Sequence, residues 1–198
     1  MSDSSLAPWR SLLAGALHRN RSLVYARYFQ LATIAPDGSP TNRTVVFRGF
    51  LDPGDRVQII TDARSEKIPQ LAADPRAEVC WYFPKTREQF RLTGTIEVVT
   101  ATTTDAALQK ARRQIWHNVS DGARSSFAWP EPGADRADAA AFEVAPLDKT
   151  TPLDSFVLLV LSVDRVDRLQ LRGEPQARQI FTRGSDEKSG WDTREVNP

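Results

Sequence analysis

The sequence predicts a β-barrel, or a strongly curved antiparallel sheet, with a few helices packed outside it. Short segments rich in β-branched and aromatic residues recur along the chain and are separated by turn signals. Only a few segments have helical periodicity. A doubly wound parallel sheet is the weaker alternative, because the chain has neither regular βαβ alternation nor a G-x-G-x-x-G fingerprint.

Size and composition predict a single water-soluble domain spanning residues 1–198. The 198 residues are 40% hydrophobic and 26% charged, which is ordinary globular usage. The formal net charge is only +1, so no global field attracts nucleic acid or an anionic membrane. Any anion site must therefore be local.

Cysteine and histidine usage argues against a metal site and favours the cytoplasm. Cys80 is the only cysteine, which excludes an intrachain disulfide and a multi-cysteine metal site. The two histidines, His18 and His117, lie far apart and belong to no metal-binding motif. No apolar run is long enough to cross a membrane, and the N-terminus has no signal-peptide pattern.

The first half of the chain alternates strands with short helices. Apolar residues recur at helical spacing over residues 6–17, and a hairpin is predicted from residues 28–35 through the turn at 36–40 to residues 44–50. A second turn at 52–55 leads into a strand at 56–61 and a helix at 65–73. Strands at 78–83 and 89–99 and a helix at 105–119 follow.

The second half begins with a long connection. Prolines, a glycine and an alanine-acid tract between residues 129 and 152 have no clear period. Strand character returns at 157–163, 168–171 and 179–182, and the chain closes on Trp191 with a short tail.

Three polar stretches are candidates for binding. In the first, Arg43 and Arg48 bracket an apolar strand, an arrangement that solvated charges also explain. In the second, Thr61, Ser65 and Lys67 gather where a strand gives way to a helix, and free N–H groups, hydroxyls and a cation there suit a phosphate. Ser65 as an ordinary helix cap and Lys67 as a surface residue are the alternative.

The third stretch is a strand in which Gln89 shares a face with Arg91 and Thr93. A buried amide needs a partner, and a bound heterocycle with carbonyl and ring-nitrogen edges supplies one. An exposed glutamine on a sheet face is the common alternative.

The order of these stretches resembles the FMN-binding split-barrel family typified by pyridoxamine 5′-phosphate oxidase. The resemblance implies a mainly antiparallel split barrel with FMN as cofactor, and it extends over most of the chain. Arg43 matches an arginine whose strand lies along FMN, here through Thr44, Val45 and Val46, while Arg48 replaces the family's lysine. The family's phosphate-binding positions are occupied here by Thr61, Ser65 and Lys67. Glu66 stands where the family has an arginine.

The resemblance also implies a ring contact and a homodimer. Gln89 matches a glutamine against the flavin ring, and Arg178 resembles the arginine that completes FMN binding from a late strand. Family members build two FMN sites across a subunit interface, so a homodimer is expected. The segments Pro-Trp-Arg-Ser-Leu-Leu, Leu-Arg-Gly and Val-Asn-Pro resemble the Alr4036-type subfamily more closely.

The departures from the family fall where a substrate would lie. Glu174, Pro175 and Gln176 replace a segment that supplies the oxidase with a basic group and an imidazole, and Leu169 replaces a tryptophan beside the flavin. Trp116, Arg124 and Ser125 lie near the family's pocket-lining positions, with core packing the alternative for Trp116 and helix capping for Ser125.

The sequence thus predicts an FMN-dependent oxidoreductase acting on an unidentified small molecule, with little pyridoxamine 5′-phosphate oxidase activity. A non-enzymatic flavin-binding or stress-response module is the alternative from a different class. A split barrel that prefers haem or a deazaflavin is a third, and the lack of a histidine near the predicted pocket argues against haem.

Overall fold

A computed structural model describes residues 6–52, 54–184 and 190–198. Pro53, part of the second predicted turn, lies outside the described residues. The elements in chain order are α1 (Pro8–Arg19), η1 (Val24–Arg27), β1 (Tyr28–Ile34), β2 (Pro40–Val46), β3 (Gly49–Phe50), β4 (Val57–Asp62), α2 (Lys67–Ala73), β5 (Arg76–Phe83), β6 (Glu88–Val99), α3 (Ala106–Asn118), α4 (Asp121–Ser125), η2 (Ser126–Ala128), η3 (Ala139–Phe142), β7 (Phe156–Gln170), β8 (Ala177–Arg183) and β9 (Trp191–Val196).

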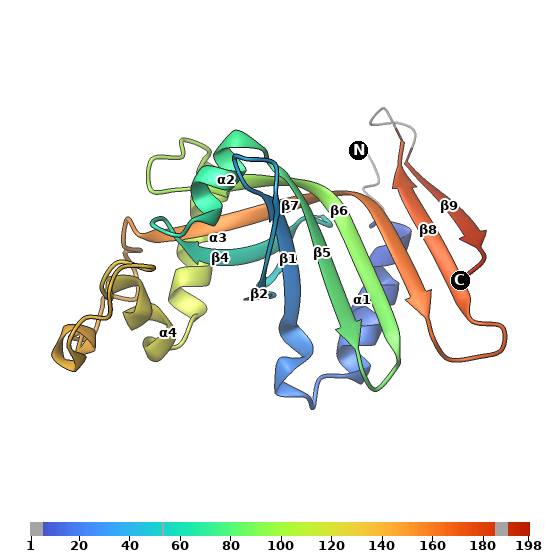
Figure 1. The fold of residues 1–198 in the computed structure, drawn as a ribbon, viewed down its shortest axis with the longest axis horizontal. Coiled ribbons are helices and arrows are strands. Elements are labelled where there is room, and N and C mark those ends of the chain that lie inside the picture. The colour runs from blue at the N-terminus through green and yellow to red at the C-terminus, as the bar shows by residue number, and fades with distance from the viewer. Residues whose placement is uncertain (1–5, 53, 185–189) are drawn as a thin grey trace.

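The strands form one antiparallel sheet that curls into a half-barrel (Figure 1). Its order is β2-β1-β5-β6-β7-β4-β3, with β8 added to β7 and β9 to β8. The long β7 pairs with β4 over Phe156–Leu161 and with β8 over Arg165–Gln170. The first half of β7 therefore joins β4 to the sheet, and the second half joins β8. The prediction of a curved antiparallel sheet with peripheral helices is confirmed.

The predicted hairpin is present, but its second strand starts and ends earlier than expected. β1 and β2 pair from Tyr28 and Val46 to Ile34 and Pro40 across the predicted turn. β2 ends at Val46, because the next two backbone N–H groups, of Phe47 and Arg48, donate to the carbonyls of Arg27 and Gln58 outside β1. The remainder of the expected strand is the short β3.

Two other strand predictions were wrong in extent. The segments expected at 157–163 and 168–171 are one continuous strand, and the expected tail after Trp191 is strand β9. In β7, polar residues interrupt the apolar run. Val163 and Val166 are nevertheless buried in the same cluster, because the ladder with β6 skips Asp164 and shifts the alternation by one residue. β9 is polar and mostly exposed, so only its ladder with β8 defines it.

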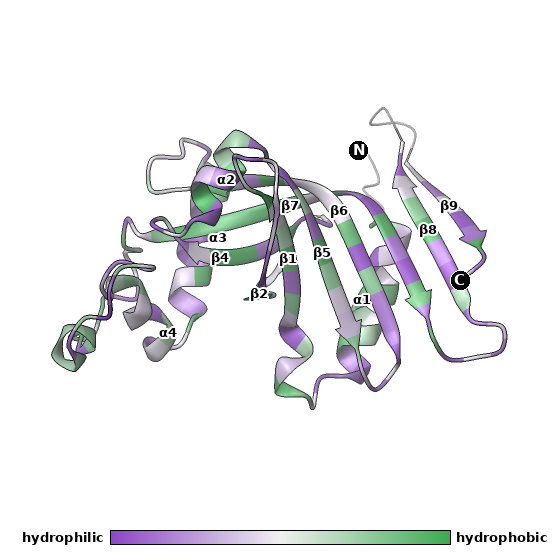
Figure 2. Ribbon diagram, in the orientation of Figure 1, coloured by the Kyte–Doolittle hydropathy of each residue, from purple (hydrophilic) through white to green (hydrophobic). Residues whose placement is uncertain are grey.

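The apolar residues form two clusters on the two sides of the sheet. The first lies inside the half-barrel and joins Trp9 and Leu13 of α1 to Phe29, Trp81 and Phe90. The second lies beneath α3. Because the first half of β7 contacts both clusters, it is apolar on successive residues, whereas the outer strands alternate in hydropathy (Figure 2).

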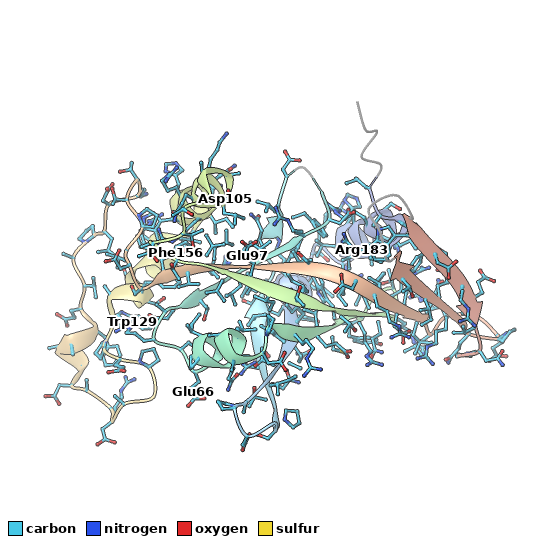
Figure 3. All side chains as sticks on the ribbon, turned by 90° about the horizontal axis from the view of Figure 1, so that it is seen from above. Glu66, Glu97, Asp105, Trp129, Phe156 and Arg183 are labelled. Carbon is cyan, nitrogen blue, oxygen red and sulfur yellow. The ribbon has the colours of Figure 1, made fainter. Side chains whose placement is uncertain are left out.

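Viewed from above, Asp105, Trp129 and Phe156 mark one end of the molecule, and Arg183 of β8 lies toward the other (Figure 3). Within the described ranges, no helix is long and apolar enough to cross a membrane.

Candidate functional site

Lys67 is held by two hydroxyls at the junction between β4 and α2. Its Nζ donates to Thr61 Oγ1 at 2.9 Å and to Ser65 Oγ at 2.5 Å. Ser65 is not the helix cap: α2 begins after Glu66, which makes no capping bond, and the Ser65 hydroxyl bonds Lys67 instead. The helix has only seven residues, so side chains rather than a helix dipole would bind an anion here.

Arg43 approaches the same end of the half-barrel from β2. Its side chain lies on the inner face of the sheet, since Arg43 pairs with the buried Leu31. Nη1 donates to Thr33 Oγ1 at 2.5 Å, and Nη2 donates to Thr41 Oγ1 and Gln70 Oε1, both at 3.0 Å. Four neutral oxygens in all, including the Leu31 carbonyl, accept from this guanidinium.

The two cations form a site without a salt bridge, here called the Arg43–Lys67 cluster, although the charge of Glu66 acts on both of them. Burial, and then the nearby Arg43 charge, lower the pKa of Lys67. Burial also lowers the pKa of Arg43. Among the described residues, neither cation has a carboxylate within salt-bridge distance. Hydroxyls and a guanidinium beside a half-buried ammonium are the donor set that suits a phosphate.

Arg48 lies beside a different cavity. It follows β2, and its backbone N–H donates to the Gln58 carbonyl at 2.9 Å. The buried Nε has no hydrogen-bond partner among the described residues, and burial lowers the pKa of the guanidinium. The cavity, of about 470 Å³, lies between β3, β4 and α3, where Lys110, Gln114 and Asn118 line it. It contains none of the residues of the Arg43–Lys67 cluster.

Gln89 and Arg178 lie together elsewhere, on the outer face of the sheet. Gln89 pairs with Leu169 across β6 and β7, and Leu169 pairs with Arg178 across β7 and β8. Directly paired residues of antiparallel strands share a face, so these three side chains form one row. Arg178 donates to both oxygens of the buried Asp167, at 3.0 and 2.8 Å, which lowers the pKa of Asp167.

The two groups of predicted FMN residues are far apart within one chain. Thr61 pairs with Val157 near the start of β7, whereas Leu169 lies near its end. The intervening residues correspond to about 40 Å along the strand. The groups also lie on opposite faces of the sheet, because Arg43 and Thr61 face inward and Gln89 faces outward. Within one chain, the two groups therefore do not face the same side of the sheet.

The three residues expected near a substrate pocket have structural contacts. Trp116 is fully buried among Phe127 and Phe156, and its Nε1 donates to the Asp148 carbonyl at 2.9 Å. Arg124 is also buried, and its Nη2 donates to carbonyls at the end of α3, including that of Trp116 at 2.9 Å. Ser125 Oγ donates to the Asp121 carbonyl. These contacts favour core packing for Trp116. Ser125 precedes η2 but makes no side-chain capping bond. Contact of the three residues with a substrate stays a prediction.

Sequence reasoning missed three residues that contact Arg43: Thr33, Thr41 and Gln70. The threonines lie in strands, where threonine is common on either face. Gln70 had a usable signal, because it follows Lys67 by three positions in a predicted helix and such residues share a helix face.

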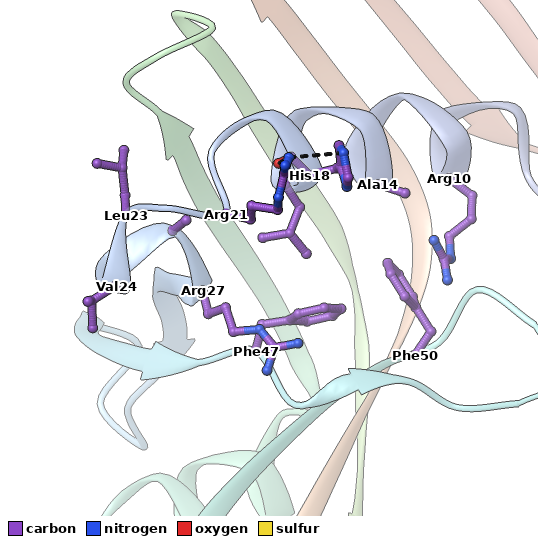
Figure 4. Close-up of a pocket in the computed structure, with 11 residues that line it drawn as sticks. Arg10, Ala14, His18, Arg21, Leu23, Val24, Arg27, Phe47 and Phe50 are labelled. Carbon is purple, nitrogen blue, oxygen red and sulfur yellow. Dashed lines mark hydrogen bonds between the residues drawn. The ribbon is translucent and has the colours of Figure 1, made fainter.

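A further cavity, of about 440 Å³, lies between α1 and the segment joining β2 to β3 (Figure 4). Arg10 and His18 of α1, with Arg21 just after the helix, line it opposite Phe47 and Phe50. Arg21 Nη1 bonds the His18 ring at 3.0 Å. None of the residues predicted to bind FMN lines this cavity.

Comparisons with known proteins define the class as FMN-binding split barrels. The family model "Pyridoxamine 5'-phosphate oxidase, FMN-binding domain" matches residues 6–100. A pyridoxine/pyridoxamine 5'-phosphate oxidase 2 of Arabidopsis thaliana is 41% identical over 197 residues, which cover 98% of each chain. The structure of a pyridoxamine 5'-phosphate oxidase-related, FMN-binding protein of Nostoc punctiforme is 50% identical, with a TM-score of 0.94 over 98% of this chain and 100% of that one.

A more distant structure, PhzG of Burkholderia lata in complex with tetrahydrophenazine-1-carboxylic acid, shares the fold at 18% identity. Its TM-score is 0.76 over 99% of this chain and 95% of that one. The chain therefore belongs to the pyridoxamine 5'-phosphate oxidase-related family of FMN-binding proteins. The sequence-based predictions of family, fold and FMN as cofactor are confirmed at this level.

Proposed function

We propose that this chain is an FMN-dependent oxidoreductase that binds the FMN phosphate at the Arg43–Lys67 cluster. The observation that supports this most is the pair of half-buried cations held by neutral oxygens, since buried positive charge without a carboxylate favours an anion. Thr61 and Ser65 add hydroxyls to the phosphate site. Thr44, Val45 and Val46 would lie along the cofactor, with Arg48 beyond them.

The flavin ring would be contacted by Gln89 and Arg178 of a second copy of the chain. Within one chain these residues lie on the other face of the sheet from the Arg43–Lys67 cluster and toward the other end of β7. A two-fold dimer brings one group of each copy against the other group of its partner, so two equivalent sites form. We therefore propose a homodimer with FMN at the interface.

When bound, FMN supplies two-electron redox chemistry, and the protein's part is to bind, orient and tune it. The Arg43–Lys67 cluster fixes the phosphate. Gln89 offers an amide to the edge of the ring, and Arg178 adds positive charge that Asp167 holds in position.

We propose an unidentified small molecule as substrate, with little activity on pyridoxamine 5'-phosphate. Glu174 and Gln176 are exposed just before β8, and neither offers the basic group or imidazole that the resemblance places there. A carboxylate facing the pocket would disfavour a phosphorylated substrate. The Arabidopsis relative is named an oxidase, so a direct assay of oxidase activity in this protein tests the proposal. Pyridoxal 5'-phosphate formation by FMN-saturated protein under air, at the rate of a genuine oxidase, would contradict this proposal.

The purified protein should be yellow and should release FMN rather than FAD. The cationic cluster suits one terminal phosphate, and no dinucleotide fingerprint accompanies it. The measurement is the absorption spectrum, followed by chromatography of the released flavin. A colourless protein that also fails to bind added FMN contradicts the proposed cofactor.

A non-enzymatic flavin-binding module is the second candidate, because most departures from the family fall on the substrate side, whereas Glu66 is the one departure in the phosphate-binding stretch. Rapid reduction of bound FMN by a candidate substrate separates the enzyme from the module.

We further propose a single domain over residues 1–198, a cytoplasmic location based on the lone Cys80, and membership of the Alr4036-type subfamily.

A further inference from the structure

We propose that Gln70 is a positioning residue that holds Arg43 for the FMN phosphate and thereby sets the preference for FMN over riboflavin. This inference rests on the proposed phosphate site. Gln70 lies in α2 and is only 6% exposed. Gln70 is not among the motif residues on which the sequence resemblance to the family was based.

Three hydrogen bonds converge on one atom of Gln70. Its Oε1 accepts from Arg43 Nη2 at 3.0 Å, from Thr33 Oγ1 at 2.7 Å and from Thr41 Oγ1 at 3.1 Å. Arg43 can only donate, so the amide cannot turn its NH₂ group toward the guanidinium without placing donor against donor. The orientation of Gln70 and that of Arg43 therefore determine each other.

The same bonds connect all the side-chain oxygens that hold Arg43. Thr33 and Thr41 each contact the guanidinium and also contact Gln70 Oε1. Removing the amide would leave both hydroxyls and one Nη2 donor without their common acceptor. The guanidinium would then be free to adopt other rotamers, which weakens any bond that needs its orientation.

Gln70 also links Arg43 to Lys67. The two helical residues are three positions apart, so they lie on one face of α2. Lys67 and, through Gln70, Arg43 are thus both positioned by the same short helix. Because the amide is neutral, it orients Arg43 without cancelling its charge, which a carboxylate at this position would do.

The test compares FMN with riboflavin, which lacks the phosphate. In the full-length protein stripped of flavin, the dissociation constants of both ligands are measured by titration. Gln70→Leu should weaken FMN by about tenfold, the loss of one charge-assisted hydrogen bond, and change riboflavin binding by less than about twofold. Gln70→Glu keeps the acceptor and the volume but neutralises Arg43, so it should lower the FMN preference at least as much.

Gln109→Leu is the matched control, because this helical glutamine donates to backbone carbonyls of residues 100, 101 and 103, away from the cluster. It should leave the FMN-to-riboflavin ratio unchanged. Equal losses of both ligands in Gln70→Leu would assign the residue a structural role and overturn the proposal, as would an unchanged ratio. A wild-type protein that binds both flavins equally would instead contradict the phosphate site itself.

Discussion

At the residue scale, the central feature is positive charge buried beside neutral oxygens. Lys67 and Arg43 are close enough for the arginine to lower the pKa of the lysine, yet neither has a carboxylate partner in the described part of the chain. Such an arrangement costs folding free energy that a salt bridge would reduce. In the proposed site, a bound phosphate would recover it.

Replacing Lys67 with methionine should weaken FMN binding by about ten- to a hundredfold, because a charge-assisted hydrogen bond contributes about 1.5–3 kcal/mol. Lys149→Met is the control, since Lys149 is exposed and pairs with the exposed Asp121. Titration of flavin fluorescence measures both variants. An unchanged affinity in Lys67→Met would mean that Lys67 is only a surface residue.

The affinity for FMN should fall at alkaline pH earlier than an ordinary lysine would predict. Burial and Arg43 lower the pKa of Lys67 below its usual 10.5, so the ammonium is lost as pH rises through that lowered value. Lys67→Arg, whose guanidinium does not titrate in this range, should keep its affinity to higher pH. An identical alkaline loss in both proteins would show that another group titrates.

The same shift has the opposite sign for the stability of the flavin-free protein. Between the lowered pKa and the ordinary one, the unfolded chain binds more protons at Lys67 than the folded chain does. The contribution of this group to the free energy of unfolding therefore increases with pH across that window. Denaturation at a series of pH values measures it.

Sequence patterns identified the cations and hydroxyls of this site but not the residues that hold Arg43 in position. Thr61, Ser65 and Lys67 were predictable, because hydroxyls and a cation cluster at one strand-to-helix junction. Thr33 and Thr41 were not, since their role depends on the pairing of β1 with β2. Trp116 and Arg124 show the converse: their burial in the second apolar cluster and at the end of α3 is a tertiary property that position alone does not reveal.

At the scale of elements, β6 and β7 approach each other closely at Gly94. Their register shifts between Thr93 and Gly94. A Cβ on Gly94 would lie 1.9 Å from the Ser162 carbonyl oxygen and 2.9 Å from its carbonyl carbon, both backbone atoms. Only glycine fits there without moving one strand.

Gly94→Ala should therefore lower the free energy of unfolding by at least about 3 kcal/mol, or prevent folding, because the backbone of β7 must move. Gly122→Ala in α4 is the matched control: its added Cβ meets nothing within 4 Å, and alanine favours a helix by up to about 1 kcal/mol. Urea denaturation compares the two. Equal stabilities would contradict the proposed close approach.

Strands with a clear apolar alternation were predictable, and polar strands were not. β1 and β6 were predicted to within one residue at each end, because their buried and exposed residues alternate. β7 was divided in two at its polar middle, and β9 was missed because its residues carry almost no apolar signal. These strands are specified by their partners in the sheet rather than by their own composition.

At the scale of the whole molecule, the arrangement of the predicted site residues favours the proposed site shared between two chains. The Arg43–Lys67 cluster lies at the inner end of the half-barrel, whereas Gln89 and Arg178 lie on its outer face toward the far end of β7. The family resemblance implied a site shared between two chains. Where the two groups of site residues lie in the sheet, however, is known only from the strand pairing in the structure. Light scattering should accordingly show a dimer, and a monomer that retains FMN would argue against shared sites.

Complementation between two defective chains tests the shared site most directly. One chain carries Lys67→Met and the other carries Gln89→Ala with Arg178→Ala, so each alone lacks one half of every site. Co-expressed and paired at random, they form mixed dimers in which one site has both halves intact. About a quarter of all sites should then bind FMN with wild-type affinity. If the mixture binds no more FMN tightly than the two variants do separately, each chain builds its site alone and the shared-site account is wrong.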